Sequence, residues 1–322
     1  MKRGLLFLLT VLILFGSGAG VFAAGKGDAK AYPSKDITLI VPFAPGGGTD
    51  ALARKMADIA KADLGVNIPV VNKPGGSGAV GMGEVALTAA DGYTIVMATV
   101  EAVLLPLAGL ATFKTEDLAP IIRINYDPAA LFVRADSGIN SVADLVNAGK
   151  KDPGKISIMV SAYPTNFWLC GAMFKELSGA DFNIIPEPGG AAEEIKNLLG
   201  GHVNAMVITP AEGASYVKSG DFKLLAIASD KKDPNYPNVP LFKELGYDVV
   251  VGTWRGFMAP KNVPANVINT LEKAFTKAYQ SNDMKEFLKT MGFGEGFLNP
   301  ADFSKLLVDQ AKAYGPIISK YK

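Results

Sequence analysis

The strongest constraint on the fold is an alternation of short apolar runs and helical patterns that begins at residue 36. Residues 37–43 form the continuous apolar run ITLIVPF, as expected for a strand buried on both faces. Further strands are predicted at 68–71, 93–99, 130–134, 156–161, 203–209 and 224–229, and helices at 51–61, 141–148, 167–177 and 191–199. Such alternation predicts an α/β fold with mainly parallel sheets flanked by helices.

The end of the chain departs from this alternation. Residues 267–281, 283–291 and 300–320 have helical patterns with no strand predicted between them, and Asn299-Pro300 fits the cap and first turn of the last helix. Two α/β units with a helical tail fit a two-lobed protein better than one long sheet. The predicted domains are therefore residues 33–127 with 251–322 as lobe 1, and residues 128–250 as lobe 2.

The first residues have the pattern of a secretory signal peptide. Lys2 and Arg3 precede an apolar run over 5–15, and small residues follow up to 23–24. The apolar run is short for a membrane span, although an uncleaved membrane anchor is the alternative interpretation. We therefore expect residues 1–24 to be removed and the mature protein to be periplasmic or otherwise extracytoplasmic.

Composition excludes several classes of function. One Cys allows no internal disulfide, and one Cys with one His cannot form the usual Cys/His zinc sites. The 32 Lys and Arg residues nearly cancel the 31 Asp and Glu residues, so no global basic field attracts nucleic acid. We expect no metal, no cofactor and no nucleic-acid partner.

The strongest local signal is a glycine-rich strand-to-helix connection, here called the glycine turn (residues 43–50). Its three glycines allow several backbone N–H groups to point in one direction, and Thr49 or Asp50 is expected to cap the following helix. A helix N-terminus with free N–H groups favours a carboxylate or phosphate. The charge of Asp50 argues against a phosphate unless that side chain turns away. The alternative is a tight turn whose glycines only save space. The candidate residues are Phe43, Ala44, Pro45, Gly46, Gly47, Gly48, Thr49 and Asp50.

A second glycine-rich segment, residues 72–81, contains the dinucleotide-type spacing G-x-G-x-x-G. The glycines are Gly76, Gly78 and Gly81, and Glu101 follows twenty residues after the last of them. The fingerprint should come directly off a strand, whereas Asn-Lys-Pro-Gly intervenes here, so a nucleotide site is disfavoured. Ser77 of this segment is retained as a ligand-binding candidate.

Two further strand-to-helix connections lie in the second half of the chain. Residues 186–192 read PEPGGAA and lead into a helix whose first turn holds Glu193 and Glu194, which suits the helix dipole. Residues 161–168 read SAYPTNFW, and their hydroxyl and amide groups can donate hydrogen bonds to an oxygen-rich ligand.

Taken in order, these segments carry a family resemblance over about residues 33–320. The chain contains YPSKDITLIVPFAPGGGTDALAR, VVNKPGGSGAVG, ADGYTIVMAT, PGGAAEEIKNLLGGHVNAM and GTWRGFMAPKNVP. They resemble the periplasmic solute receptors of tripartite tricarboxylate transporters, also called Bug receptors, and the PGGG-TD block is the most specific of them. The resemblance implies a two-lobed periplasmic binding protein (type II, Venus flytrap) that closes on a small carboxylate and delivers it to a membrane permease.

The resemblance also implies roles for individual residues. It places one ligand carboxylate against Phe43–Thr49, with Asp50 closing the turn. Paired glycines of the opposing lobe correspond to Gly189 and Gly190, and the end of a strand near the cleft corresponds to Thr99 and Glu101. The W-R-G segment corresponds to Trp254 and Arg255. Arg255 then either binds a second carboxylate in a bidentate manner or forms a salt bridge that braces the hinge.

One segment departs from the family pattern. Many relatives have a Gly/Ser-rich loop followed by His, whereas this chain has Pro164 within the loop and Trp168 in place of that His. Proline removes an N–H donor and the aromatic residues add bulk, so the ligand could be a flatter or more apolar acid. Alternatively, the aromatic side chains pack within lobe 2. The loop's candidate ligand residues are Ser161, Ala162, Tyr163, Thr165, Asn166 and Trp168.

An enzyme is the alternative class of function. Hydrolysis would need an activated nucleophile with a base in reach, and Cys170 and His202 form the only Cys/His pair in the sequence. Cys170 lies in an apolar helical stretch, which favours a buried, inert thiol. No serine lies in a G-x-S-x-G elbow. We therefore expect a monomeric receptor for a di- or tricarboxylate, an amino acid or an aromatic acid, with permease subunits as partners, rather than a secreted α/β enzyme.

Overall fold

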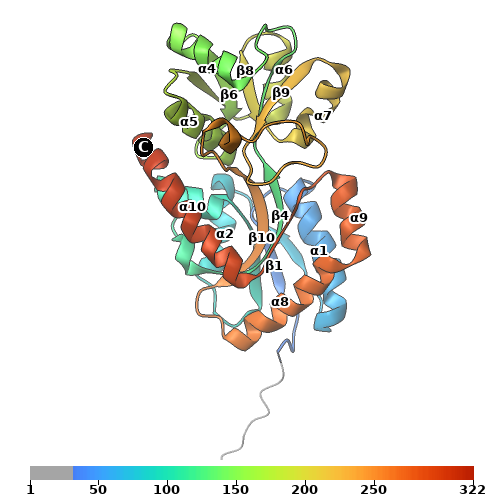
Figure 1. Cartoon of the computed structure of the whole chain (residues 1–322). Helices are drawn as coiled ribbons and strands as arrows, with labels where there is room; N and C mark the ends of the chain where they lie inside the picture. The colour runs from blue at the N-terminus through green and yellow to red at the C-terminus, as the bar shows by residue number, and fades with distance from the viewer. Residues whose placement is uncertain (1–31) are drawn as a thin grey trace, which may run out of the picture. The chain divides into compact units, whose positions relative to one another are not determined.

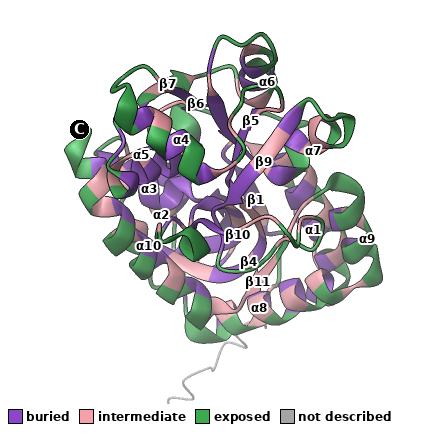
Figure 2. Ribbon diagram, turned by 45° about the horizontal axis from the view of Figure 1, so that its top comes forward, coloured by how far each residue is buried: buried purple, intermediate pink, exposed green. Residues whose placement is uncertain are grey.

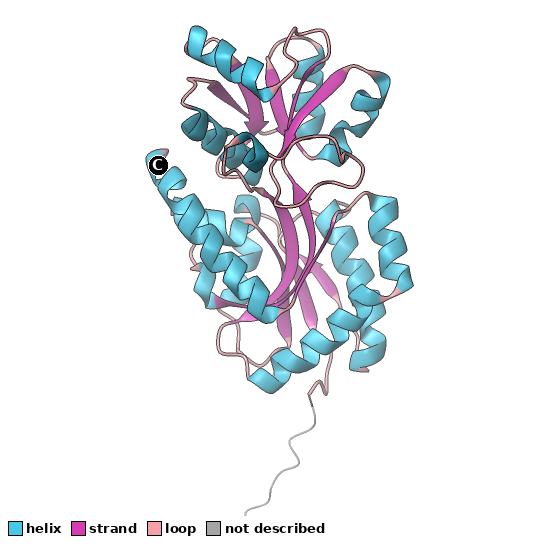
Figure 3. Cartoon of the chain, viewed as in Figure 1, coloured by secondary structure: helices cyan, strands magenta, loops and turns pink. Residues whose placement is uncertain are grey.

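The computed structural model describes residues 32–322. The predicted signal peptide, residues 1–24, lies outside the described residues. Within 32–322 no helix combines the length and the apolar content needed to cross a membrane. These residues form one compact unit of two sheets with their helices, which Figures 1 and 3 show as separate groups of strands.

Sheet A has six strands in the order β11-β4-β10-β3-β1-β2. The strands are β1 (Thr38–Val41), β2 (Val70–Asn72), β3 (Thr94–Thr99), β4 (Leu118–Pro128), β10 (Gly252–Pro260) and β11 (Glu295–Leu298). Strand β1 pairs in parallel with β2 and β3, whereas β10 is antiparallel to both β3 and β4, and β11 is antiparallel to β4.

Sheet B has five strands in the order β7-β6-β8-β5-β9. The strands are β5 (Ala130–Arg134), β6 (Ser157–Ser161), β7 (Asn183–Glu187), β8 (Ala205–Ile208) and β9 (Phe222–Ile227). Strand β6 pairs in parallel with β7 and β8, and β5 is antiparallel to β8 and β9.

The α/β class is confirmed, but the expectation of mainly parallel sheets is wrong, because both sheets are mixed. The reason is that the chain passes between the two sheets twice. Strand β4 leaves sheet A directly for β5, and β10 brings the chain back, so β10 lies antiparallel beside β4 along nine residues (Figure 1). Such a return needs no helical crossover, which parallel neighbours would require.

The helices of sheet A lie on its two faces. They are α1 (Gly48–Leu64), α2 (Ala79–Ala86), α3 (Glu101–Ala108), α8 (Ala265–Gln280), α9 (Asn282–Met291) and α10 (Pro300–Lys320). Sheet B carries α4 (Val142–Lys151), α5 (Asn166–Ser178), α6 (Ala191–Leu199) and α7 (Pro210–Ser219). Short 3-10 turns occupy Gly76–Gly78, Thr115–Asp117 and Phe242–Leu245. The helices and strands predicted from periodicity are all present, with ends shifted by a few residues.

The prediction of no strand in the helical tail is wrong, because β11 lies between α9 and α10. Two glycines allow its close approach to β4: a Cβ on Gly294 would lie 2.3 Å from the carbonyl oxygen of Tyr126, and one on Gly296 would lie 2.5 Å from the Tyr126 nitrogen. The expected start of α10 is confirmed, since the Asn299 side chain accepts a hydrogen bond from the Asp302 N–H at 2.9 Å.

The buried residues, which line the strands and the inward faces of the helices (Figure 2), form three apolar clusters among the described residues. One lies between sheet A and helices α1 and α8, where Phe257 stacks on Phe275 with ring centroids 4.1 Å apart. A second lies on the opposite face of sheet A beneath α2, α3 and α10 and continues into sheet B beneath α5. The third lies between sheet B and helices α6 and α7.

Helix α10 contacts both halves of the molecule. It packs on α3 and β4 of sheet A, and its end reaches α5 of sheet B. There Lys320 pairs with Glu176 at 2.5 Å, and the ring of Tyr321 meets Trp168 edge-on at 5.2 Å. The residue-level lobe boundaries at 127–128 and 250–251 stay a prediction, although the sheet to which the strands belong changes between 128 and 130 and between 227 and 252.

Candidate functional site

The glycine turn presents backbone N–H groups at the start of α1. Gly47 is the N-cap residue in an extended conformation, and Gly46 has a φ of +85°, which favours glycine. Residues 44–47 are exposed, whereas Phe43 and Gly48 are half-buried. The first N–H groups of a helix have no partner within the helix, so those of Gly48 and Thr49, beside the N-cap residue Gly47, form the kind of helix start that favours an anion.

Asp50 holds this turn closed in a way that differs from the predicted helix cap. Its carboxylate accepts a hydrogen bond from the Gly46 N–H at 2.9 Å, from Arg54 at 3.0 Å and from the Asn72 amide at 2.9 Å. The Asn72 amide also donates to the Phe43 carbonyl at 3.0 Å. Burial raises the pKa of Asp50, but these hydrogen bonds outweigh it and lower that pKa overall. Arg54 thus offsets the charge of Asp50 within the turn, which reduces the repulsion that this carboxylate would exert on an anion at the remaining N–H groups.

Arg255 braces the first turn of α1 from β10. Its Nε donates to the Thr49 hydroxyl at 3.0 Å, and its Nη1 donates to Asp127 at 2.9 Å. The third guanidinium nitrogen, Nη2, lies near Gly48, since a Cβ on Gly48 would lie 3.8 Å from it. Phe293 covers the same guanidinium with its ring centroid 5.0 Å away. Of the two roles that the sequence left open for Arg255, the bracing salt bridge is present.

The partner of Arg255, Asp127, lies where β4 leaves sheet A. It also accepts hydrogen bonds from the Asn125 amide at 2.8 Å and from the Gly294 N–H at 2.7 Å. Burial raises the pKa of this carboxyl, while Arg255 and the Gly294 N–H oppose that rise. Asn125 is fully buried and also accepts the Arg255 N–H at 3.0 Å, so one compact network joins β4, β10 and the glycine turn.

Thr99 and Glu101 lie beside Arg255, as expected for the end of a strand near the site. Thr99 pairs with Arg255 across β3 and β10, and its hydroxyl donates to the Glu101 carboxyl. Both residues are buried. Burial raises the pKa of Glu101, and the Thr99 hydrogen bond and the charge of Arg255 act against that rise.

The side chain of Trp254 lies on the opposite side of sheet A from that of Arg255. It is fully buried, its indole N–H donates to the Gln310 side chain at 2.9 Å, and its ring packs edge-on against Phe303. Successive strand residues face opposite sides of a sheet, so Trp254 faces α10 while Arg255 faces α1. In this conformation Trp254 is therefore a core residue with no exposed surface for a ligand.

The loop at 161–168 uses its polar groups internally. The hydroxyls of Ser161 and Thr165 bond to each other, and Thr165 caps α5 by accepting the Trp168 N–H at 3.4 Å. The Asn166 amide donates to the Thr253 hydroxyl at 2.9 Å, which links the start of α5 to β10. Ala162, Tyr163 and Thr165 are half-buried.

The aromatic residues of this loop pack against one another. Trp168 is 4% exposed and lies edge-on to Tyr163, with centroids 4.6 Å apart, as well as to Tyr321. Of the two alternatives for this loop, the structure therefore shows packing for Trp168 rather than an indole face presented to solvent.

The remaining candidates lie in exposed turns. The Gly189 N–H donates to Glu187 at 2.7 Å, and Gly190 is the N-cap residue of α6 with a φ of +77°. Ser77 is exposed within its 3-10 turn. In the G-x-G-x-x-G segment, a Cβ on Gly81 would lie 2.9 Å from Lys73 and Pro42 backbone atoms, so that glycine permits close packing.

One residue near these turns had been interpreted only as a helix-dipole partner. Glu194 is fully buried, and neither of its carboxyl oxygens has a hydrogen-bond partner within the described part of the chain. Burial, followed by the charges of Glu212 and Glu187, raises its pKa to about 8. The periodicity of α6 contained the signal, because Glu194 lies four residues before the buried Leu198 on the same helix face.

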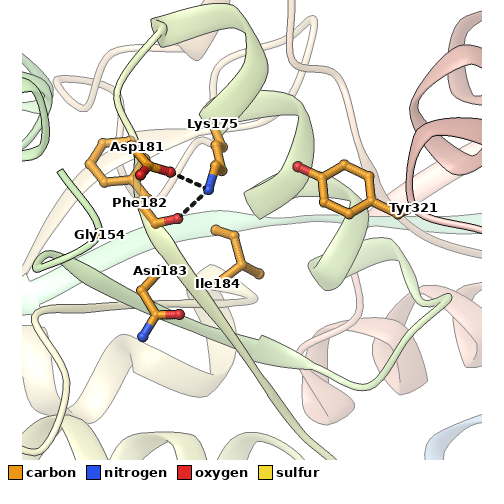
Figure 4. Close-up of a pocket in the computed structure, with 7 residues that line it drawn as sticks. All are labelled: Gly154, Lys175, Asp181, Phe182, Asn183, Ile184 and Tyr321. Atoms are coloured by element: carbon orange, nitrogen blue, oxygen red, sulfur yellow. Dashed lines mark hydrogen bonds and ion pairs between the residues drawn. The ribbon is translucent and has the colours of Figure 1, made fainter.

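Two other features are a surface pocket and a buried cysteine. A surface pocket of about 360 Å³ is lined by Lys175, Asp181, Phe182 and Tyr321 among others (Figure 4), but Lys175 already donates to Asp181 and to the Phe182 carbonyl. Cys170 is fully buried, and burial raises the pKa of its thiol to about 12. Among residues 32–322 no group of three or more His, Cys, Asp and Glu side chains could hold a metal ion.

Comparison with known proteins gives these features a family context. A model described as the tripartite tricarboxylate transporter family receptor matches residues 52–322. Protein BugT of Bordetella pertussis (strain Tohama I) is 30% identical over 319 residues, which cover 97% of this chain and 96% of BugT.

Solved structures agree with the family match. A TctC solute-binding protein from Polaromonas, without ligand, has a TM-score of 0.83 and 34% identity, covering 90% of this chain and 99% of that one. Rpa4515 of R. palustris, with adipate, has a TM-score of 0.72 and 25% identity, covering 89% and 97%. The predicted two-lobed periplasmic-binding-protein fold is thereby confirmed.

Proposed function

The chain belongs to the tripartite tricarboxylate transporter receptor family, and on this basis we propose that it is an extracytoplasmic receptor for a small carboxylate. The observation that carries the proposal is the glycine turn at the start of α1. Residues 44–47 of this turn are exposed, the first N–H groups of α1 have no partner within the helix, and the carboxylate of Asp50 is bonded to Gly46 and Arg54. The ligand carboxylate accepts hydrogen bonds from Gly47, Gly48 and Thr49.

Arg255 strengthens this site without being freely available to the ligand. Its salt bridge with Asp127 cancels much of its charge, while its bond to Thr49 fixes the first turn of α1. We propose that its Nη2, which lies near Gly48, donates to the bound carboxylate. The binding energy therefore comes mainly from oriented backbone dipoles rather than from an exposed cation.

The second half of the site comes from sheet B. Residues 161–166 and the Gly189–Gly190 turn follow the carboxyl ends of β6 and β7, where α/β sheets bind ligands. A ligand that bonds to both halves favours the state in which both sets of hydrogen bonds form at once. We propose that this closed state is what the membrane permease subunits recognise when the ligand is delivered.

A thermal-shift screen tests this function. The mature protein is heated with mono-, di- and tricarboxylates, amino acids and aromatic acids, starting with adipate because Rpa4515 of R. palustris was solved with it. A ligand at one hundred times its dissociation constant adds about 2.7 kcal/mol to the free energy of unfolding. Stabilisation by at least one acid, clearly reduced in a Gly47→Val variant at the same ligand concentration, supports the proposal. A response to no acid, together with turnover of one of them, would favour a secreted enzyme instead.

A further inference from the structure

Glu194 has no partner in a fold that otherwise satisfies its buried carboxyls. Its side chain is fully buried in the first turns of α6, and both oxygens lack a hydrogen bond within residues 32–322. By contrast, the buried Asp50 and Glu101 each receive hydrogen bonds from neighbouring residues. An unpaired buried carboxyl costs about 1–3 kcal/mol or more, which a group that donates to it would recover.

The charged groups close enough to Glu194 to act on its carboxyl, Glu187 and Glu212, are also acidic. Glu187 lies at the end of β7 with Oε1 on the Gly189 N–H, and Glu212 lies in the first turn of α7, bonded to Thr209. We call Glu187, Glu194 and Glu212 the acidic cluster. Beneath α6, strands β6 and β8 contain no charged residue, and β5 contains only Arg134, which pairs with Asp136 near Gly201. On α6 itself, Lys196 pairs with the exposed Glu193.

One member of the acidic cluster is linked to the glycine turn through intervening residues. The start of α7 meets the end of α9, because a Cβ on Gly292 would lie 3.8 Å from Cβ of Ala211. The next residue, Phe293, packs on Gly48 and on the guanidinium of Arg255. Glu212 is also close enough to Asp127 for its charge to raise the pKa of that carboxyl. The start of α7, which carries Glu212 of the acidic cluster, is therefore linked to the glycine turn through Gly292 and Phe293.

We propose that the acidic cluster, through Glu194, binds a protonated amino group of the ligand whose carboxylate binds at the glycine turn. The ligand class is then an amino acid or another amino-carboxylate rather than an amino-free di- or tricarboxylate. This inference rests on the proposed carboxylate receptor function and adds the group that selects among carboxylates. Glu194 becomes ionised when the ammonium group arrives and donates to it.

Matched pairs of acids test the inference in the mature protein. Titration calorimetry compares aspartate with succinate, glutamate with glutarate, and 2-aminoadipate with adipate, since the members of each pair differ by one amino group. We expect the amino member of at least one pair to bind about tenfold or more tightly, as a charge-assisted buried hydrogen bond allows. Glu194→Gln should abolish that preference, whereas Glu193→Gln, at the exposed neighbour on the same helix, should keep it.

The number of protons released on ligand binding gives a second measurement. The pKa of Glu194 near 8 in the unliganded protein means that an ammonium ligand displaces a proton at pH 7. Binding heats measured in phosphate and in Tris buffer should therefore show release approaching one proton per ligand, and none in Glu194→Gln. The melting temperature of Glu194→Gln, expected to equal or exceed that of the wild type, reports whether the variant is folded.

The outcomes separate the two proposals. If amino-free acids bind as tightly as their amino partners, or more tightly, the acidic cluster does not bind a cation, while the carboxylate receptor stands. If no acid of either kind binds, both the proposed receptor function and this inference are wrong.

Discussion

Arg255 and Asp127 form an ion pair with 2.9 Å between Nη1 and Oδ2, although 128 residues separate them in the chain. The two side chains are only 14% and 13% exposed, and they join β10 to the end of β4. Since Arg255 also donates to Thr49, the pair connects the passage between the sheets to the glycine turn. A change at Asp127 should thus alter both stability and ligand binding.

Asp127→Asn tests this connection. The variant leaves a nearly buried guanidinium without its counter-charge, so we expect the free energy of unfolding to fall by about 3 kcal/mol. Urea denaturation measures that change. Asp309→Asn, which breaks the exposed pair between Asp309 and Lys305, should cost less than about 0.5 kcal/mol. Equal effects of the two substitutions would contradict a bracing role for Asp127.

Gly47→Val tests the glycine turn without straining it. Gly47 is extended, and a Cβ there would meet only the Ala44 carbonyl oxygen, at 3.8 Å, so the cost in stability should stay below about 1 kcal/mol. The branched side chain covers the N–H groups, and carboxylate affinity should fall at least about tenfold by calorimetry. Ala62→Val, at an exposed position later in α1, is the matched control and should bind normally. Unaltered affinity of the Gly47 variant would rule out the turn as the carboxylate site.

Trp254→Phe separates core packing from ligand contact. The substitution removes the donor to the buried Gln310, so we expect a loss of about 1–3 kcal/mol in the free energy of unfolding. Carboxylate affinity should change by less than about threefold, because Trp254 has no exposed surface. A large loss of carboxylate affinity at unchanged stability would show instead that Trp254 contacts the ligand.

Glu194 should make stability depend on pH in a specific direction. Its pKa is raised from 4.5 to about 8, so between these values the folded protein keeps a proton that the unfolded chain releases. The free energy of unfolding therefore falls as pH rises through this window, by at most about 1.4 kcal/mol per unit from this group. Urea denaturation at pH 5, 6.5 and 8 should show a smaller decrease for Glu194→Gln than for the wild type. Parallel curves for the two proteins would show that Glu194 is charged throughout.

Cys170 and His202 should be dispensable for binding. The pKa of the buried thiol is raised to about 12, so it forms almost no thiolate at neutral pH, and His202 is exposed in a turn. We expect Cys170→Ala and His202→Ala to change carboxylate affinity by less than about twofold in calorimetry. Iodoacetamide at pH 8 should modify Cys170 only after unfolding. Rapid modification of the native protein would contradict the burial of this thiol.

The sequence predicted the elements well where each one has its own periodicity. The helices at 51–61 and 191–199 and the strands at 37–43 and 130–134 carry apolar patterns that need no distant partner. Strand β11 has four residues and exists because Gly294 and Gly296 let it approach β4, 167 or more residues earlier in the chain. The mixed sheets have the same origin, since the direction of β10 is set by pairing and not by its own residues.

The candidate site also combines features that local sequence predicts with features that only the folded chain brings together. The glycine turn was predictable because φ-permissive residues before a helix have a local meaning, whereas Asp127 became the partner of Arg255 only through folding. That Trp254 and Arg255 face opposite sides of the sheet could have been predicted from the sequence, since consecutive strand residues alternate between the two faces. The burial of Glu194 depends on how α6 packs on sheet B, which no local pattern fixes completely.

The contact between Trp168 and Tyr321 gives the protein an intrinsic optical reporter. The sequence contains two tryptophans, and Trp254 is held in the core by Gln310. Trp168 instead lies where the loop at 161–168, at the start of α5, meets the end of α10, the helix that contacts both sheets. In a Trp254→Phe background, Trp168 is the single indole fluorophore, so its emission reports on the junction at which the start of α5 meets the C-terminal helix.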